Sequence, residues 1–566
     1  MNMKKKIVAV SILTVLFCVL FSFSASAAEH THCQCGGVSC SSIAEHDDTP
    51  HTWTPIDADD PMPTESGYYY LTEDKDVDTY LRDMPAGADI YLCLNGKRLY
   101  LRGAEFINCN LHICDCCGEG SIQPLGEIAY VIWVKDGQLD MYSGTIGASG
   151  TKALQASGTS TVNIYSGRIV SSSSNAIDIL NGVTCNIYGG EIHTYAVPDN
   201  TYVGPDWAFA VRNCGAVNLY GGSIIGNPQA VYMNDLNCKL NIYGGTIQGD
   251  GEQTILAQWH GTVNMCGGTI SSNADTDDYL IYMDNSGCTF NMSGGSMICE
   301  KRPGITQNGV VNVSGGTMTT GGSAFACSGG TISGGTINAN LAAKSKYAVQ
   351  LCGEKFSMSG GKVIFNNPGS DENYRFCFLV NADNRTFEMT GGELISEEYV
   401  FNAFYKGKYN LYGGTFVSTG SSVFSGYYQN GCVINTSDPN SYIADAVMSA
   451  QTDGSGAIPF VYDSNIANCK YISVSRVPQV VSESCSVIGT ELSFKAVPNY
   501  DSCVLFAALY GSNGRMKSAS GPTVVTSAEN RPEFSFKSYS SGDRIRLYVC
   551  EPGSIIPLLD HGSFTP

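Results

Sequence analysis

The stretch LNIYGGTI, from Leu240 to Ile247, decides the fold of this chain because eleven related copies of it lie around it. The first copy is LDMYSGTI, which begins at Leu139, and the last is YNLYGGTF, which ends at Phe416. Neighbouring copies are on average about 24.5 residues apart, so the chain is a repeat array. The conserved second glycine of each copy is Gly144, Gly167, Gly190, Gly222, Gly245, Gly268, Gly295, Gly316, Gly335, Gly361, Gly392 and Gly414.

Apolar and polar residues alternate within each copy, which is typical of a β-strand. Val162 and Ile164 point to one side, and Asn163 and Tyr165 point to the other. A glycine turn, a second short strand, a loop and a third apolar segment complete each repeat. Three short strands per coil predict an all-β parallel β-helix solenoid. Leucine-rich repeats have a similar length, but they need a leucine frame and a helical half that this sequence lacks.

Two polar columns are predicted on the outside of this solenoid, opposite an inner stack of Val, Ile and Leu. Burying each inner side chain stabilises the fold by about 1.5–3 kcal/mol. We interpret stacked asparagine amides as structural, because they hydrogen-bond along the axis and hold the register. Stacked tyrosines are also mainly structural, but their hydroxyls offer a strip for weak glycan or protein contact. The asparagine column is Asn163, Asn186, Asn218, Asn241, Asn264, Asn291, Asn312 and Asn410; the tyrosine column is Tyr142, Tyr165, Tyr188, Tyr220 and Tyr243, with Tyr412 at the far end.

The first 27 residues have the features of a secretory signal peptide. Lys4, Lys5 and Lys6 precede an apolar run, and Ala25-Ser26-Ala27 follows it as a cleavage signal. No second apolar run of membrane-spanning length follows, so we expect a secreted or cell-surface protein with no membrane span. The net charge of −20 argues against nucleic acid and anionic lipid as partners.

Cysteines are numerous, 23 in all, and they are scattered at repeat-equivalent positions. Cys185 takes an inner Val/Leu position and Cys266 takes a tyrosine position. This scatter favours small buried hydrophobes over a disulfide framework, although a few stacked pairs could be bridged. The density of thiols indicates a reducing, anaerobic habitat.

Composition shifts divide the chain into six segments. Gly96 and Gly120 continue the glycine spacing backwards from Gly144, so the solenoid is expected to begin two coils before the clear repeats. Alternating runs near the C-terminus predict a small antiparallel β-sandwich. The segments are a signal peptide (1–27), a Cys/His-rich segment (28–54), a connector with the N-terminal cap (55–89), the β-helix (90–435), an end cap with linker (436–476) and the β-sandwich (477–566).

The Cys/His-rich segment is the sharpest chemical signal. Zn²⁺ takes four thiolate or imidazole ligands, and so short a segment with few apolar residues needs such a staple to fold. We predict a structural zinc site at Cys33, Cys35, Cys40 and His46, with His32 as a substitute ligand. The spacing is not a standard CxxC pair, so a linker or a disulfide remains the alternative.

A possible ligand groove comes from aligning the third segments of successive coils. Five polar residues fall at or near outward positions, beside a long loop between His193 and Trp207, with Trp259 nearby. They could line a shallow sugar groove, or form an ordinary solvated face. The five are Asp178, Arg212, Asn234, Gln258 and Asp284, of which Asp178, Arg212 and Asp284 are the candidates for catalysis.

Several phrases together resemble a family of exported β-helix proteins from anaerobic Gram-positive gut bacteria, within the pectate-lyase-like superfamily. The phrases are HTHCQCGG (30–37), IYLCLNG (90–96), LHICDCCGEGSI (111–122), the NIYGGTI repeats and TSDPNSYIAD (436–445). The resemblance implies a right-handed β-helix and a surface or carbohydrate-related role. The lyase sequence WxDH is absent, and so is the motif series of polygalacturonases.

These observations favour a monomeric, non-catalytic β-helix that binds glycans or a host or bacterial surface through its long face. A carbohydrate-active enzyme, most plausibly a polysaccharide lyase, is the first alternative. A structural cell-wall protein is the second. Apart from zinc, no cofactor is expected.

Overall fold

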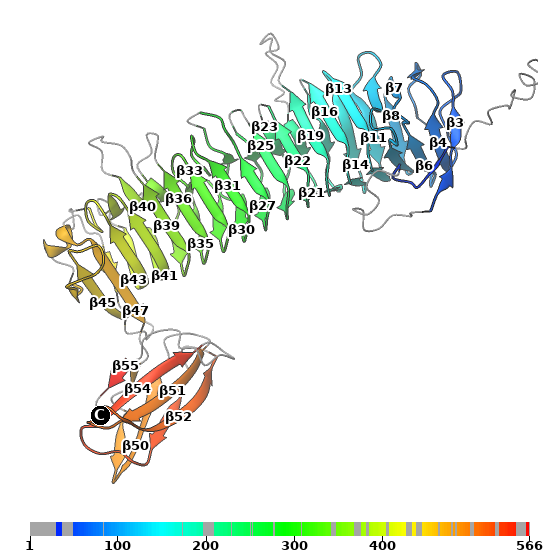
Figure 1. Cartoon of the computed structure of the whole chain (residues 1–566). Helices are drawn as coiled ribbons and strands as arrows, with labels where there is room; N and C mark the ends of the chain where they lie inside the picture. The colour runs from blue at the N-terminus through cyan, green and yellow to red at the C-terminus, as the bar shows by residue number, and fades with distance from the viewer. Residues whose placement is uncertain are drawn as a thin grey trace, which may run out of the picture. The chain divides into compact units, whose positions relative to one another are not determined.

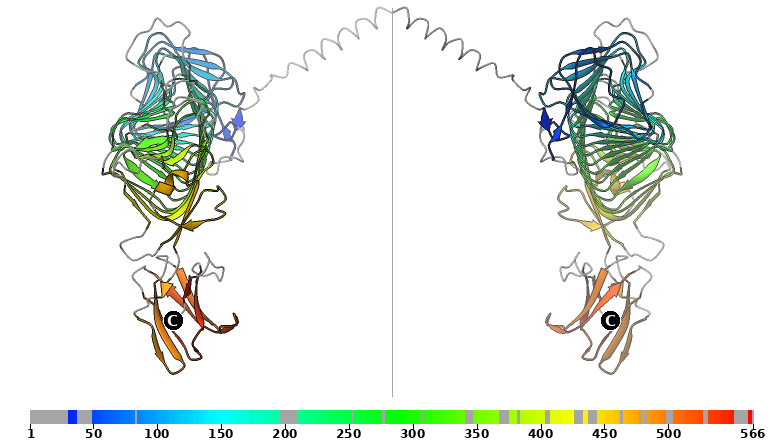
Figure 2. Two further views of the ribbon diagram at one scale, coloured as in Figure 1. Left: turned by 90° about the vertical axis from the view of Figure 1, so that its left-hand side faces the viewer. Right: turned by 90° about the vertical axis from the view of Figure 1, so that its right-hand side faces the viewer.

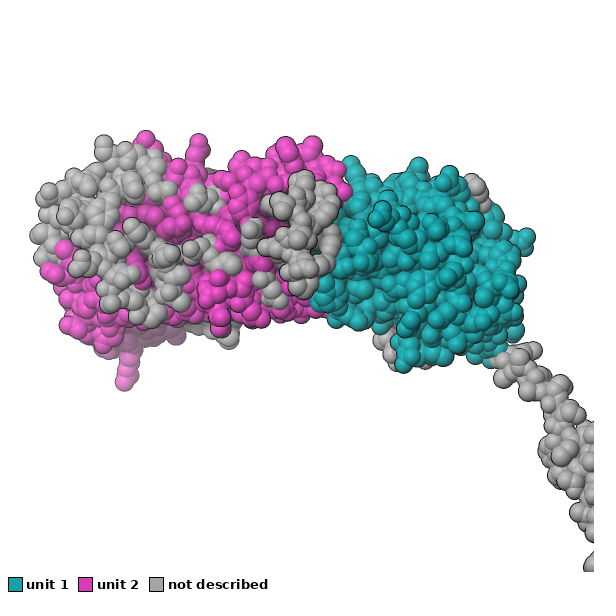
Figure 3. All heavy atoms as spheres, turned by 90° about the horizontal axis from the view of Figure 1, so that it is seen from above, with its two compact units in different colours: residues 1–207 teal, residues 208–566 magenta. Residues whose placement is uncertain are grey.

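The computed structural model is all-β over the part of the chain that it describes, apart from a short 3-10 helix, η3 (Ser464–Asn468). No helix in this part is long and apolar enough to cross a membrane. The chain divides into two compact units, Met1–Trp207 and Ala208–Pro566 (Figure 3). The described residues are 30–36, 49–82, 84–172, 174–195, 209–227, 229–249, 251, 253–275, 278–306, 308–340, 347–366, 375–380, 384–402, 407–425, 433–436, 444–461, 464–476, 479–480, 484–497, 503–526, 531–550 and 562–564.

Each coil of the first unit places three short strands on those of the next coil in parallel register (Figure 1). The repeat phrase forms the first strand, the residues after the glycine pair form the second, and the third apolar segment forms the third. First strands are β6 (Asp89–Cys93), β9 (Asn110–Cys114), β12 (Gln138–Met141), β15 (Thr161–Ile164) and β18 (Thr184–Ile187); second strands are β7 (Arg98–Leu101), β10 (Ser121–Pro124), β13 (Thr145–Ser149), β16 (Arg168–Ser172) and β19 (Glu191–Tyr195); third strands are β8 (Ala104–Ile107), β11 (Tyr130–Lys135), β14 (Lys152–Ser157) and β17 (Ile177–Ile179).

Parallel pairing in this unit reaches back beyond residue 90, where the sequence predicts the β-helix to begin. β3 (Thr54–Ile56) pairs with β4 (Gly67–Leu71), β4 pairs with β6, and β5 (Lys75–Val77) pairs with β7. The buried ammonium of Lys75 donates hydrogen bonds to the carbonyls of Asp57 and Ala58 at 3.0 and 2.7 Å. These bonds join β5 to the segment that follows β3. Before β3, β1 (Thr31–His32) and β2 (His51–Thr52) form an antiparallel pair.

The second unit repeats the same arrangement (Figure 2). β41 (Thr386–Ser396) and β43 (Lys408–Ser418) each run through both the first and second positions. First strands are β21 (Ala216–Leu219), β24 (Lys239–Ile242), β27 (Thr262–Met265), β30 (Thr289–Met292), β32 (Val310–Val313), β35 (Gly329–Ile332) and β38 (Lys355–Met358); second strands are β22 (Ser223–Gly226), β25 (Thr246–Gly249), β28 (Thr269–Ser271), β31 (Ser296–Cys299), β33 (Thr317–Thr320), β36 (Thr336–Asn340) and β39 (Lys362–Asn366); third strands are β20 (Phe209–Asn213), β23 (Gln229–Met233), β26 (Ile255–Ala257), β29 (Ile281–Met283), β34 (Phe325–Cys327), β37 (Tyr347–Leu351), β40 (Phe376–Val380) and β42 (Tyr399–Phe401).

The parallel β-helix predicted from the repeat is therefore confirmed, and so is its inner stack. Leu240 and Ile242 are fully buried and lie in register with Val263 and Met265 of the next coil. Among the cysteines, Cys185 is fully buried as predicted, and its burial raises the pKa of the thiol to about 12.

The asparagine column hydrogen-bonds along the axis as predicted. Asn264 donates from Nδ2 to Oδ1 of Asn241 at 2.8 Å, and accepts the equivalent bond from Asn291 at 2.8 Å. The same bond joins Asn186 to Asn163 at 2.9 Å in the first unit. One amide per coil thus holds the register of the sheet, which supports the structural interpretation.

The last coil is covered by antiparallel strands, as a solenoid end requires. After β44 (Val433–Asn435), β47 (Tyr471–Arg476) pairs antiparallel with β43 and with β45 (Ala444–Ser449), which also pairs with β46 (Ile458–Pro459). This pairing covers the edge at the second position of β43.

Two antiparallel sheets near the C-terminus share one apolar core, which agrees with the predicted β-sandwich. Leu492 and Phe494 from one sheet and Leu505 and Leu547 from the other are buried together. One sheet contains β48 (Gln479–Val480), β49 (Ser486–Ile488), β50 (Glu491–Val497) and β53 (Glu533–Phe536); the other contains β51 (Cys503–Tyr510), β52 (Met516–Val525), β54 (Arg544–Cys550) and β55 (Gly562–Phe564).

Candidate functional site

Three of the predicted groove residues lie on neighbouring coils of the second unit. Asn234, Gln258 and Asp284 each follow directly after the last residue of β23, β26 and β29. The backbone N–H groups of Gln258 and Asp284 donate to the carbonyls of Met233 and Ala257, one coil back, at 2.9 and 3.1 Å. The parallel ladder therefore continues through these three residues, whose side chains are half-buried.

Trp259 follows Gln258 in a tight turn that presents its indole to solvent, with 56% of the residue exposed. Trp259 and His260 have φ angles of 53° and 69°, in the left-handed region, which costs a non-glycine residue about 1–3 kcal/mol. The N–H of Gly261 donates to the Gln258 carbonyl at 3.1 Å and closes the turn. The His260 ring covers Gly287 of the next coil, where an added Cβ would lie 1.9 Å from the ring. The turn is thus held in place by packing despite its strain.

The Asp284 carboxyl lies against this turn. Burial raises the pKa of the carboxyl, and hydrogen bonds from the backbone of Trp259 and from the thiol of Cys288 partly offset the rise. His260 also lowers this pKa through its charge. The carboxylate therefore helps to fix the Trp259 turn.

Aromatic side chains continue the same face along the coils. Tyr232 donates a hydrogen bond from its hydroxyl to Oε1 of Gln258 at 2.7 Å. Tyr232, Leu256 and Tyr282 lie in one register column, and Tyr282 is 37% exposed. We call the turns after β23, β26 and β29, with Trp259 and Tyr282, the indole face.

Of the remaining two groove candidates, Arg212 lies in a different register column from Asn234, and Asp178 belongs to the first unit. Asp178 lies in register with Gln155, and Arg212 with Tyr232, which is two residues before Asn234. Asp178 lies between the core residues Ile177 and Ile179, in the register column of the half-buried Gln155, and its side chain is covered: Lys152 Nζ contacts the carboxylate at 2.6 Å. The alignment of Arg212 with Asn234 is therefore wrong, because the register differs from it by two residues. Trp207 and residues 196–206 of the predicted loop lie outside the described residues, and His193 belongs to β19.

The tyrosine column stacks as predicted. Ring centroids of Tyr142 and Tyr165 are 5.2 Å apart, and those of Tyr165 and Tyr188 are 5.1 Å apart, with planes within 8° of parallel. Tyr220 and Tyr243 stack at 4.9 Å. Because the ring faces contact one another, ring edges and hydroxyls face solvent, and Tyr188, Tyr220 and Tyr243 are 44–49% exposed.

Tyr142 differs from the other tyrosines because it is buried, at 5% exposure. It packs with Cys33, Cys35, Trp53 and Cys93 in an apolar cluster. The N-terminal segment thus covers the first tyrosine of the column, which the sequence places in solvent. Burial raises the pKa of its hydroxyl.

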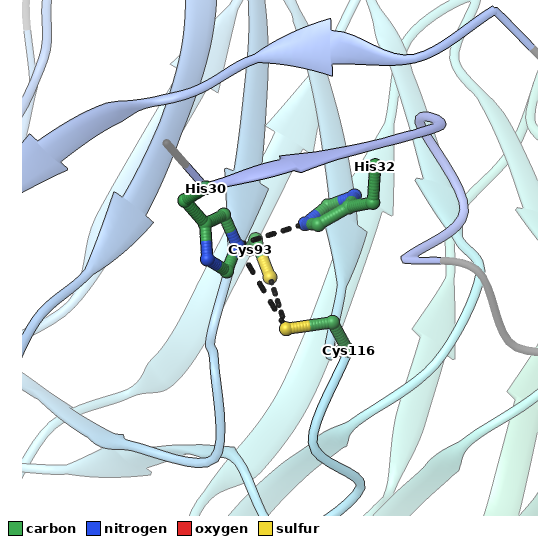
Figure 4. Close-up of side chains that lie close together, drawn as sticks. All are labelled: His30, His32, Cys93 and Cys116. Carbon is green, nitrogen blue, oxygen red and sulfur yellow. Dashed lines mark hydrogen bonds between the residues drawn. The ribbon is translucent and has the colours of Figure 1, made fainter. Parts of the chain in front are cut away.

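Four metal-binding side chains converge beside this cluster (Figure 4). They are His30 and His32 on either side of Thr31, Cys93 at the end of β6, and Cys116 two residues after β9. One donor atom from each lies within 4.8 Å of the others. We call this group of four side chains the His/Cys cluster.

Measured distances within the His/Cys cluster are short. Nε2 of His30 lies 3.0 Å from Nε2 of His32 and 3.8 Å from Sγ of Cys116, and Sγ of Cys116 lies 3.6 Å from Sγ of Cys93. Burial lowers the pKa of His30, and the charge of His32 lowers it further, so the neutral imidazole is favoured.

The zinc ligands predicted from the sequence are only partly placed. Cys33 and Cys35 are buried next to the cluster, with their Sγ atoms 3.0 Å apart. Cys40 and His46 lie outside the described residues. Sequence reasoning missed Cys93 and Cys116 as partners, although the dense CDCC run (114–117) at the second coil was an available signal.

Comparisons with known proteins leave the site to be interpreted from its own geometry. No protein-family model, no curated protein and no solved structure matches this chain. The function of the protein is therefore inferred from the chemistry of the indole face and of the His/Cys cluster.

Proposed function

We propose that this protein is an exported or cell-surface, non-catalytic β-helix that binds glycans through the indole face. The observation that carries the proposal is Trp259, an exposed indole held out on a strained turn. The resemblance of the chain to exported β-helix proteins of anaerobic Gram-positive gut bacteria agrees with such a role. The stacked tyrosines within each unit would add weak contacts.

The energetics of the Trp259 turn support ligand binding. Burying an indole stabilises a protein, whereas this turn leaves it exposed and adds the cost of two left-handed residues. Folding alone gains no stability from an exposed indole on a strained turn. A ligand that stacks on the indole would gain binding free energy from the contact. Sugar rings present apolar C–H faces for stacking and hydroxyls for hydrogen bonds.

Polar neighbours of Trp259 suit those hydroxyls. Asn234, Gln258 and Asp284 offer amide and carboxylate groups on successive coils, spaced at about 4.8 Å. A linear polysaccharide running along the axis could contact several coils at once, and several weak contacts would then act together. An open face of this kind favours weak, extended binding.

Catalysis remains the second candidate, and one observation favours it. The raised pKa of Asp284 beside His260 is the kind of perturbation that a general acid or base needs. Arg212 would be a further candidate in a lyase. A structural wall protein, the third candidate, would bind no glycan at all.

Binding to panels of neutral glucans and polyuronates, measured on an array and by calorimetry, tests the proposal. We expect Trp259→Ala to weaken binding about tenfold, because the stacking contact is lost. Ile298→Ala, which removes another exposed apolar side chain of this unit, is the matched control and should bind normally.

The same panels are assayed for reducing ends and for the absorbance of unsaturated uronate products. Turnover abolished by Asp284→Asn or Arg212→Ala would replace the binding proposal with an enzymatic function. Equal binding by the wild-type protein and Trp259→Ala, or no binding to any glycan, would overturn the role given to the indole face.

A further inference from the structure

We infer that His30, His32, Cys93 and Cys116 form a tetrahedral Zn²⁺ site that fastens the N-terminal strand pair to the first coils of the β-helix. This ligand set replaces the four positions predicted from the sequence with residues from three separate segments. The site is independent of the proposed glycan binding.

Three of the six ligand–ligand distances within the His/Cys cluster are close to those of a tetrahedron, and all six are at most 4.8 Å. Zn–N bonds of about 2.05 Å and Zn–S bonds of about 2.3 Å give edges of about 3.3 Å for N···N, about 3.6 Å for N···S and about 3.8 Å for S···S. The corresponding distances are 3.0 Å for His30 and His32, 3.8 Å for His30 and Cys116, and 3.6 Å for Cys93 and Cys116. Shifts of a few tenths of an ångström would bring all three edges to the ideal values.

The contacts of His32 prepare one ring nitrogen as a ligand. Its Nδ1 lies 2.6 Å from the carbonyl oxygen of Cys33, which can only accept, so Nδ1 carries the proton. Nε2 then has a lone pair, and it points toward Nε2 of His30 and the two thiols (Figure 4). A backbone carbonyl that fixes the tautomer of a metal-binding histidine is a common feature of zinc sites.

Aromatic rings hold both imidazoles in place. His30 stacks on Tyr70 with centroids 4.1 Å apart, and His32 packs on Trp53 at 4.2 Å. The indole N–H of Trp53 donates to the His32 carbonyl at 3.1 Å. Packing thus restricts the orientation of both imidazoles, which lowers the ordering cost of binding an ion.

Both thiols come from the edge of the solenoid itself. Cys93 is fully buried, and its register partner on β9 is Cys114, two residues before Cys116. Gly36 packs on the backbone of Cys116, where an added Cβ would lie 3.2 Å from the amide nitrogen. The N-terminal segment therefore contacts the same turn that supplies the second thiol.

Zinc binding would release protons from these thiols. A free cysteine thiol has a pKa of about 8.5, so a thiol without a metal is mainly protonated at neutral pH. On binding, each S–H bond breaks, the sulfur pair forms a bond to Zn²⁺, and the proton goes to solvent. About two protons should be released per ion at neutral pH.

A metal link explains how so short a strand pair can be ordered. β1 and β2 have two residues each, and an isolated hairpin of that size is unstable in water. Binding free energy at a structural zinc site becomes folding free energy for the segment that it links. Chelation should therefore release residues 30–36 and 49–53 while the coils behind them stay folded.

The experiment uses the full chain without its signal peptide, purified under reducing conditions, stripped with a chelator and reloaded with Zn²⁺ or Co²⁺. We expect about one ion per chain and the visible bands of tetrahedral Co²⁺ with a thiolate charge-transfer band. Deuterium uptake should slow in peptides covering residues 30–36 and 49–53. If the reloaded protein contains no stoichiometric metal, the proposal is overturned.

Variants identify the ligands. Cys116→Ser and His32→Ala should abolish the Co²⁺ bands, whereas Cys266→Ser, at an exposed cysteine of the second unit, should keep them. Cys40→Ser should also keep them; loss in Cys40→Ser with retention in Cys116→Ser would refute this ligand set. Deuterium uptake in β12–β16 shows whether the solenoid of each variant is intact. His32→Ala tests the loss of metal with a residue outside the solenoid, so its effect does not depend on damage to the coils.

Discussion

Replacing Arg302 by methionine would remove a cation that the second unit buries completely. The Arg302 guanidinium donates to the carbonyls of Gly251, Asp278 and Tyr279 at 2.8, 2.9 and 2.8 Å, and to the Ser272 hydroxyl at 3.2 Å. These acceptors belong to the loops of the two preceding coils, so one side chain joins three coils.

The expected loss follows from those four contacts. A hydrogen bond to a charged donor contributes about 1.5–3 kcal/mol, and a buried acceptor left unpaired costs about 1–3 kcal/mol. Desolvation of the guanidinium opposes part of this gain, as the burial-lowered pKa of Arg302 indicates. Methionine fills much of the space of the apolar stem, so little cavity remains. We expect a net loss of about 3 kcal/mol, or about a hundredfold in the local opening equilibrium.

Native-state hydrogen exchange is the suitable assay, because a solenoid need not unfold in one step. The backbone N–H groups of Ser272 and Gly321, bonded to the carbonyls of Ile298 and Cys299, report opening on either side of Arg302. Lys301→Met, at the exposed neighbouring residue, is the control. Acceleration of less than about fivefold in Arg302→Met, or equal acceleration in the control, would refute the reasoning.

Three further predictions concern stability. Asn264→Ala loses two amide bonds of the asparagine column and should cost about 1–3 kcal/mol in denaturant unfolding, with Thr262→Ala close to wild type. Gly268→Ala places a Cβ 2.7 Å from the Gly244 carbonyl oxygen at a φ of 69°, so its melting temperature should fall clearly below that of Ala274→Gly. Arg168→Ala removes the half-exposed ion pair with Glu191 and should cost less than about 1 kcal/mol at pH 7. Arg168 lowers the pKa of Glu191, so this stabilisation is complete above the unfolded pKa of about 4.3 and disappears as pH falls through the folded value; a difference that grows in acid would contradict it.

The repeat made much of the fold predictable from the sequence. A residue in a parallel β-helix meets its equivalent one coil away, so a regular phrase fixes both its neighbour and its side of the sheet. Asn241 and Asn264 are in register for this reason, as are Leu240 and Val263. The loops between second and third strands vary in length, so aligning the third segments by sequence misplaced Arg212, which pairs two residues before Asn234.

The period, the inner stack, the asparagine column and the metal-binding residue types near the N-terminus can all be read from the repeat and the composition. Which of the metal-binding residues meet depends on how the chain folds back on itself. Cys116 reaches His30 across 86 positions, because the N-terminal segment folds back onto the first coils. Likewise, the exposure of Trp259 and the path of Arg302 depend on irregular turns and loops, whose packing no repeat encodes. Contacts within the ladder repeat with the period of the sequence, so they can be predicted from it. Contacts made by caps and loops depend on the three-dimensional path of the chain.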